Sequence, residues 1–149
     1  GLLCDICIVH PQLPNTIKLV DACPDVRFVL DHIGKPDIKN QVFDPWKADI
    51  KSLAKRENVI CKISGIVTEA DHANWTPEDV EPYILHVIDC FGFDRVVYGG
   101  DWFVMTLAAE YPQWIEVIDR TLEGCSETDL RKFYVENADR VYGLGSGGR

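Results

Sequence analysis

This sequence lacks long apolar runs and an excess of positive charge, and its first residues do not have the pattern of a secretory leader. No stretch approaches the roughly 20 consecutive apolar residues that a helix needs to cross a bilayer, so we expect no membrane-spanning helix. The chain has 15 basic and 24 acidic residues, a formal net charge of −9. That balance argues against binding nucleic-acid phosphates or an anionic membrane surface. The first residues contain no basic segment and no small-residue cleavage site, so we expect no signal peptide and a cytoplasmic protein.

The composition is that of one globular domain. The chain has 149 residues, 46% of them hydrophobic and 26% charged, which is enough to bury a sizeable core. Cys4 and Cys7 have a C-x-x-C spacing, but residues three apart on a strand point to opposite faces and would not easily chelate one ion. We expect the cysteines to be small buried hydrophobes in a reducing cytoplasm. The scattered set is Cys4, Cys7, Cys23, Cys61, Cys90 and Cys125.

Strand and helix patterns alternate along the chain. The expected strands cover residues 2–9, 27–30, 59–63 and 95–98. The expected helices cover residues 14–22, 45–56, 77–91, 111–122 and 126–134, and 137–142 closes the order. Between them, the polar loop 65–76 is long enough to be functional. The last residues, 143–149, form a Gly/Ser-rich tail that we expect to be flexible.

Strands that are joined by helices and buried on both faces imply parallel pairing, so the predicted fold class is α/β. Four such units fit either a small doubly wound sheet or half of a (β/α)₈ barrel, since a whole barrel takes about 250 residues. The first expected strand begins at residue 2, which suggests a chain cut from something longer.

Polar side chains follow three of the expected strands. His10 follows the first, Asp31 and His32 follow the second, and Asp101 follows the fourth after a Gly-Gly pair. The carboxyl ends of parallel strands meet at one edge, and active sites of α/β folds form there. These residue types in that position predict a catalytic site.

Each of these residues also has a structural interpretation. Asp101 after two glycines suits a turn, and His32 can satisfy a backbone carbonyl at a strand end. Lys35 can be an exposed loop cation, and Trp102 can line a pocket or plug a barrel. Two further histidines, His72 in the polar loop and His86 on a helix, are typical surface residues, although the His72 loop can also cover a site.

Five segments in order resemble the amidohydrolase-2 family, in its sugar-lactone and dicarboxylate-lactone hydrolase branch. They are residues 5–14, 28–36, 59–65, 98–102 and 137–144. The resemblance covers nearly the whole chain but only the C-terminal half of the family. It therefore implies that residues 1–142 form a partial TIM barrel, with strands five to eight.

The resemblance also assigns roles. The family's carboxylate after strand eight is the general base and matches Asp101. His10 and His32 match histidines of the same pocket, and Lys35 falls where relatives place a basic residue that grips the substrate. Phe103 departs from the family, which usually has proline there. The family's strand-one His-x-His pair is absent with that half of the barrel.

The expected reaction is hydrolysis of a lactone, the cyclic ester of a sugar acid or a dicarboxylic acid. Asp101 would activate water, and His10, His32, Lys35 and Trp102 would bind the substrate. His10, His32 and Asp101 could instead ligate one zinc or manganese ion, and a metal-free site fits these residues equally well.

Two alternatives stay open. One is a metal-dependent decarboxylase of the same superfamily. The other is a non-catalytic half barrel, because such a sheet has two open strand edges. We expect the chain alone to have little activity and to self-associate or pair with the missing N-terminal half.

Overall fold

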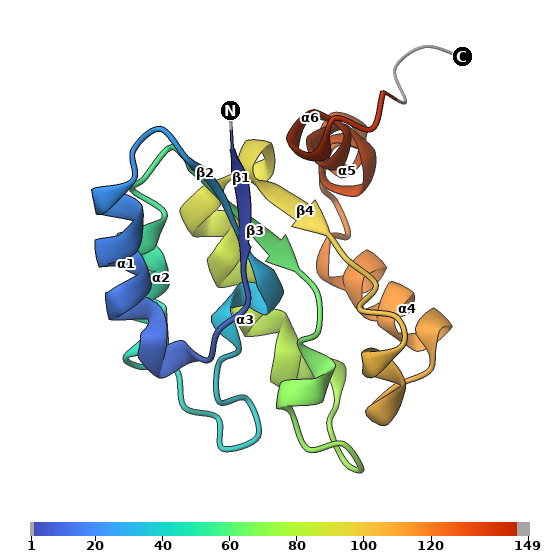
Figure 1. Ribbon diagram of the computed structural model, residues 1–149. Coiled ribbons are helices and arrows are strands. Elements are labelled where there is room, and N and C mark those ends of the chain that lie inside the picture. Colours follow the sequence, from blue (N-terminus) through green and yellow to red (C-terminus); the bar gives the residue numbers. More distant parts are fainter. Residues whose placement is uncertain (1, 146–149) are drawn as a thin grey trace.

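One parallel sheet organises the protein, and its strands lie side by side in chain order (Figure 1). The computed structural model describes residues 2–145. The strands are β1 (Leu3–Ile6), β2 (Arg27–Leu30), β3 (Val59–Ile63) and β4 (Val96–Tyr98), and every neighbouring pair is parallel. A doubly wound sheet reverses its strand order partway, whereas a barrel wall does not. The sequential order therefore matches the expected half barrel rather than the doubly wound alternative.

Helices connect and flank these strands. The helices are α1 (Leu13–Ala22), α2 (Trp46–Leu53), α3 (Pro77–Phe91), α4 (Tyr111–Thr121), α5 (Glu127–Arg131) and α6 (Asn137–Tyr142). A π-helical segment over Lys132–Glu136 joins the last two. Short 3₁₀ turns are η1 (His10–Gln12), η2 (Asp31–Gly34), η3 (Val67–Glu69), η4 (Phe93–Arg95) and η5 (Val104–Leu107). The η1 turn follows β1 after the segment Cys7 to Val9, η2 follows β2 directly, and both turns carry predicted site residues. No helix within residues 2–145 is long and apolar enough to cross a membrane.

The main core lies between the sheet and helices α1 to α4. Alternate strand residues face it, because successive side chains of a strand point to opposite sides. The strand residues in this core include Phe28, Leu30, Val59, Cys61, Ile63 and Val96. From α2, the predicted stripe of Trp46, Ile50 and Leu53 is fully buried against them. The helical side of the sheet is thus the outer wall of the half barrel.

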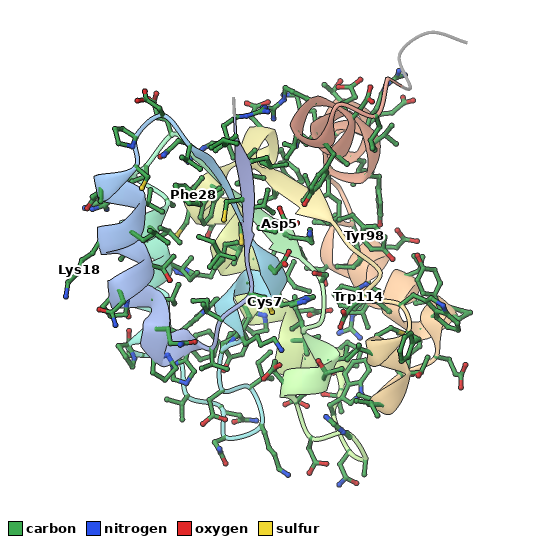
Figure 2. All side chains as sticks on the ribbon, in the orientation of Figure 1. Asp5, Cys7, Lys18, Phe28, Tyr98 and Trp114 are labelled. Atoms are coloured by element: carbon green, nitrogen blue, oxygen red, sulfur yellow. The ribbon has the colours of Figure 1, made fainter. Side chains whose placement is uncertain are left out.

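The opposite face of the sheet holds a much smaller apolar cluster. Val29, Ile60 and Val97, one from each of three strands, pack there against Val141 of α6. The remaining inward positions toward the carboxyl ends are polar or charged, and Figure 2 shows Asp5 on β1. This face corresponds to a barrel interior, and its polar end lies toward the strand ends that carry the predicted site residues.

Several boundaries differ from those expected. The first strand was predicted to reach residue 9 but ends at Ile6, because the chain turns into η1 and Cys7 to Val9 pair with no neighbouring strand. The predicted helix 45–56 ends at Leu53. The loop 65–76 contains the η3 turn. Of the predicted tail, residues 146–149 lie outside the described residues.

The expectation of buried cysteines was wrong at two positions. Cys4 and Cys7 are exposed, Cys61 is buried, and Cys23, Cys90 and Cys125 are partly buried. Within residues 2–145, Cys4 lies on the edge strand β1, which pairs only with β2, and Cys7 lies in the segment after it that pairs with no strand.

Candidate active site

The turn after β2 has an unusual left-handed backbone. His32, Ile33, Gly34 and Lys35 have φ values of 53°, 48°, 73° and 47°. Successive left-handed residues are costly for L-amino acids, especially for β-branched isoleucine. The turn is held by the fully buried Ile33 side chain and by the Trp46 indole N–H, which donates to the Ile33 carbonyl at 2.7 Å. Strain that is held in place by packing is typical of functional sites.

Asp101 also lies in a left-handed conformation, with φ 51°. The chain reaches it through Gly99, which packs directly against β3. A Cβ atom at Gly99 would lie 2.7 Å from the Ser64 Cβ. A larger residue there would push β4 away from β3 and move Asp101 with it. The glycine therefore fixes where the carboxylate leaves the sheet.

Together, these two turns bring His32 and Asp101 to the same place. The His32 Nε2 lies 3.9 Å from the Asp101 Oδ1, and the side chains are 18% and 14% exposed. That distance is too long for a direct hydrogen bond and suits a shared water or substrate group. On its other side, the His32 Nδ1 lies 2.9 Å from the hydroxyl of the buried Ser64. Ser64 thereby fixes the orientation of the imidazole ring.

Gly65 lies against both members of this pair. A Cβ atom there would lie 2.6 Å from the His32 Nδ1 and 2.9 Å from the Asp101 Oδ2, and Gly65 has φ +60°. Only glycine combines this backbone with so close an approach. The sequence prediction assigned no role to Ser64 or Gly65, although both directly follow a buried strand and lie in the segment 59–65 that carries part of the resemblance.

Lys62 is a further charged residue that the sequence reading missed. Its Nζ lies 2.6 Å from an Asp31 oxygen and 3.4 Å from an Asp5 oxygen, and 5.4 Å from the centre of the Tyr142 ring. Burial alone would lower the pKa of the Lys62 ammonium. The hydrogen bonds of Lys62 to Asp31 and Tyr142 outweigh this effect, so the pKa of Lys62 lies above its ordinary value. The sequence feature that could have pointed to Lys62 is a single cationic residue in an otherwise apolar strand.

The other predicted site residues are Lys35, His10 and Trp102. The Lys35 Nζ lies 3.7 Å from a Glu69 oxygen. The His10 backbone N–H donates to the Lys35 carbonyl at 3.3 Å, and the buried His10 Nδ1 has no hydrogen-bond partner among the described residues. Trp102 is 72% exposed. Trp102 therefore plugs no core within residues 2–145 and is free to contact a ligand or another chain segment.

Metal-ligand atoms gather beside the pair, but in a different set from the expected one. Cys7, Asp31 and His32 each offer a ligand atom within 4.8 Å of the others, the single such group within residues 2–145. The expected ligands His10 and Asp101 do not join it. Thiolate, carboxylate and imidazole are all ligands that zinc accepts. The residues present therefore fit a divalent metal.

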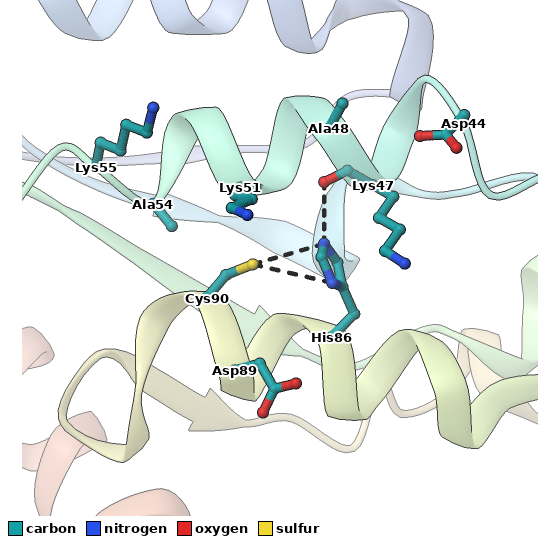
Figure 3. Close-up of a pocket in the computed structure, with 9 residues that line it drawn as sticks. All are labelled: Asp44, Lys47, Ala48, Lys51, Ala54, Lys55, His86, Asp89 and Cys90. Atoms are coloured by element: carbon teal, nitrogen blue, oxygen red, sulfur yellow. Dashed lines mark hydrogen bonds between the residues drawn. The ribbon is translucent and has the colours of Figure 1, made fainter.

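A groove of about 750 Å³ lies elsewhere, between α2 and α3 (Figure 3). Lys47, Lys51, His86 and Cys90 line it, and the Cys90 Sγ lies 3.5 Å from the His86 Nε2. None of the predicted site residues lines this groove, which is on the helical side of the sheet. The His86 Nε2 donates to the Lys47 carbonyl oxygen at 2.9 Å, and this hydrogen bond links α3 to α2.

Comparison with known proteins identifies relatives along nearly the whole chain. The L-fucono-1,5-lactonase of Burkholderia ambifaria is 36% identical over 143 residues, which cover 93% of this chain and 49% of that protein. A crystal structure of an amidohydrolase from Burkholderia multivorans with bound HEPES superposes with a TM-score of 0.89 at 31% identity, over 95% of this chain and 53% of that one.

A second crystal structure from that organism, with bound zinc, has a TM-score of 0.88 at 32% identity, over 95% of this chain and 52% of that one. The chain thus spans about half the length of these relatives, and its four strands form the C-terminal half of a TIM barrel. Residues 1–144 match the Amidohydro_2 amidohydrolase family, and the chain belongs to that family.

Proposed function

We propose that this chain supplies the catalytic half of a sugar-lactone hydrolase. The observation that carries the proposal is the His32–Asp101 pair, 3.9 Å apart at the carboxyl edge of the sheet. Both residues sit in strained, well-supported turns. The L-fucono-1,5-lactonase among the relatives supports a sugar lactone as the substrate class.

In the proposed reaction, water attacks the lactone carbonyl and Asp101 takes the proton of that water. The tetrahedral intermediate then expels the ring oxygen, and the proton passes to this alkoxide to give the open hydroxy acid. His32 lies where its Nε2 can hold the water or the carbonyl oxygen, since Ser64 fixes the ring from the Nδ1 side. Asp101 thereby carries both proton transfers, and His32 positions the groups that react.

The substrate-binding part of the proposal rests on Lys35, Trp102 and His10. Lys35 keeps a cation within reach of the edge while Glu69 limits its motion. Trp102 offers an exposed aromatic face to a sugar ring, and His10 has an unpartnered buried ring nitrogen among the described residues. A divalent ion, such as the zinc of the B. multivorans relative, would polarise the lactone carbonyl when bound.

We further propose that the site is incomplete without the other half of the barrel. The sheet ends at two open edges, β1 and β4, so a pocket wall must come from elsewhere. We place the protein in the cytoplasm, where the exposed thiols of Cys4 and Cys7 stay reduced.

The test is a complementation assay. The N-terminal half of the B. ambifaria lactonase would be fused ahead of this chain, and hydrolysis of a sugar-lactone panel followed with a pH indicator. We expect little turnover from the chain alone and measurable turnover from the fusion. Asp101→Asn should then lower kcat by about 10²–10⁴-fold, the usual contribution of a general base.

Asp89→Asn is the matched control, because Asp89 is an exposed carboxylate on α3 on the helical side of the sheet. It should leave turnover unchanged. An active fusion that keeps its kcat in the Asp101→Asn variant would contradict the proposed role of Asp101.

A further inference from the structure

We propose that Cys7, Asp31 and His32 form a binding site for a thiophilic divalent cation of the zinc type. The ligand atoms of the three residues all lie within 4.8 Å of one another. Of the metals first expected, the site would favour zinc over manganese. The inference does not depend on lactone hydrolysis, because it concerns which ion the chain binds.

The three ligands come from two adjacent strand ends. Cys7 lies just beyond β1, where Figure 2 shows it beside the η2 turn, and Asp31 and His32 open that turn. β1 and β2 pair in register up to Ile6 and Leu30, so residues that follow them emerge side by side. The exposed thiol of Cys7 is therefore held next to the carboxylate and the imidazole by the sheet itself.

Ser64 orients His32 for an ion, and Lys62 occupies only part of the Asp31 carboxylate. Ser64 already fixes the His32 ring at 2.9 Å, as second-shell partners do for metal-bound histidines. Lys62 pairs with one Asp31 oxygen at 2.6 Å, which leaves the second oxygen of that carboxylate for a cation. The ligand set is thus oriented before an ion arrives.

The charge balance also favours a dication. Binding would release the Cys7 thiol proton, so the ion would meet one thiolate, one carboxylate and a neutral imidazole. Lys62 opposes the ion, but Asp5 at 3.4 Å offers it a second carboxylate. Lys62 therefore weakens cation binding without preventing it.

The ligand types select the ion. Thiolate and imidazole suit zinc and cobalt, whereas magnesium, calcium and manganese prefer oxygen ligands. Three protein ligands leave a fourth position open, as in catalytic rather than structural zinc sites. Because the His32 Nε2 lies 3.9 Å from the Asp101 Oδ1, an ion held by these three residues would lie beside the proposed active site.

The experiment titrates Co²⁺ into the reduced 149-residue chain and follows the near-ultraviolet thiolate-to-cobalt band. We expect a band that saturates at one equivalent and that Zn²⁺, but not Mg²⁺ or Mn²⁺, removes. Cys7→Ser should abolish the band and weaken Co²⁺ binding by more than about tenfold, given that even supporting residues matter by 10–100-fold. Circular dichroism would confirm that this exposed substitution leaves the fold intact.

Two controls separate this site from other thiols. Cys4→Ser removes the neighbouring exposed cysteine of β1, and Cys90→Ser removes the thiol that contacts His86 in the α2–α3 groove. Both should keep the band. Lys62→Met should tighten Co²⁺ binding, because it removes the cation that competes for Asp31. No band in the wild type, a band that persists in Cys7→Ser, or a band lost in Cys90→Ser would overturn the proposal.

Discussion

Gly65 is the residue on which the geometry of the His32–Asp101 pair depends most closely. Gly65→Ala should place a methyl group against both side chains in addition to straining a backbone with φ +60°. Gly124→Ala is the control, because Gly124 has φ +86° but nothing within 4 Å of a Cβ atom. Backbone strain alone costs about 1–3 kcal/mol.

We therefore expect both alanine variants to lose unfolding free energy in urea, and Gly65→Ala to lose more. The effect on the His32–Asp101 pair is measured as kcat. In the fusion with the N-terminal half of the B. ambifaria lactonase, Gly65→Ala should lower kcat and Gly124→Ala should not. Equal kcat in the two variants would show that the contacts around Gly65 do not position the pair.

Tyr83 gives a prediction about alkaline pH. Its side chain is 1% exposed and its hydroxyl has no hydrogen-bond partner among the described residues. Burial, together with the charges of Asp37 and Asp79, raises the pKa of Tyr83 to about 12. Unfolded tyrosine ionises near pH 10. Because the folded pKa is raised, this contribution to stability is complete below pH 10 and is lost as pH rises toward 12.

Tyr83→Phe removes this effect. Urea unfolding at pH 8 and at about pH 11.5 should show a smaller alkaline loss in the variant, by about 1–3 kcal/mol given that one pKa unit equals about 1.4 kcal/mol. At pH 8 the variant should be no less stable than the wild type, since the hydroxyl it removes has no partner. An unchanged alkaline loss would mean that Tyr83 does not titrate with unfolding.

At the scale of elements, the sequence predicted most of the fold. α3 was expected over 77–91 and spans Pro77–Phe91, because a Thr76–Asp79 capping box, an N-terminal proline and a following Gly92 fix both ends locally. The end of β1 was misplaced, since residues 7–9 have the apolar pattern of a strand and only the missing partner ends it. Local signals specify helix ends better than they specify strand pairing.

The residues of the candidate site also fall into those that local sequence predicts and those that depend on tertiary structure. Asp101 and His32 could be predicted because each lies within a few residues of the end of a strand that has a clear sequence pattern. Cys7, Lys62 and Ser64 could not, because their roles come from register between strands and from the left-handed η2 turn. Four consecutive positive φ values that include Ile33 have no sequence signal; only tertiary packing holds them.

That dependence predicts what Trp46 does for the η2 turn. Trp46→Phe would leave the buried Ile33 carbonyl without its donor, at a cost of about 1–3 kcal/mol. Trp75→Phe is the matched control, because the Trp75 indole donates to the Ala108 carbonyl at the same distance of 2.7 Å. Both should lower the free energy of unfolding.

Only Trp46→Phe should disturb His32, and the cobalt band of the proposed metal site provides the readout. We expect weaker Co²⁺ binding in Trp46→Phe and wild-type binding in Trp75→Phe. Identical binding in both variants would indicate that the η2 turn holds its shape without Trp46.

For the whole molecule, the contrast between the two faces of the sheet matters most. Helices α1 to α4 cover one face with a large core, whereas α6 covers only part of the other. The uncovered part carries Asp5, Lys62 and the site residues, and within residues 2–145 neither β1 nor β4 has a strand partner on its outer side. In a closed barrel these edges are paired and the inner face is enclosed.

The loop after β4 adds an apolar surface at the same end of the molecule. Trp102, Phe103 and Leu107 are 72%, 71% and 65% exposed. Large side chains exposed together mark a contact surface. With two open strand edges nearby, we expect the chain alone to self-associate in a concentration-dependent way, and light scattering under reducing conditions would measure it.

If a second barrel half completes the site, as proposed above, that half should compete for the same surfaces. The fusion with the N-terminal half of the B. ambifaria lactonase should therefore shift the mass toward a monomer of the fused chain. The triple variant Trp102→Ser, Phe103→Ser and Leu107→Ser separates the two surfaces. Weaker self-association of this variant would show that the loop after β4 contributes, and unchanged self-association would show that the strand edges dominate. A monomer at every concentration would contradict the requirement for a second half, because two free edges and an exposed inner face would then be stable in water unaided.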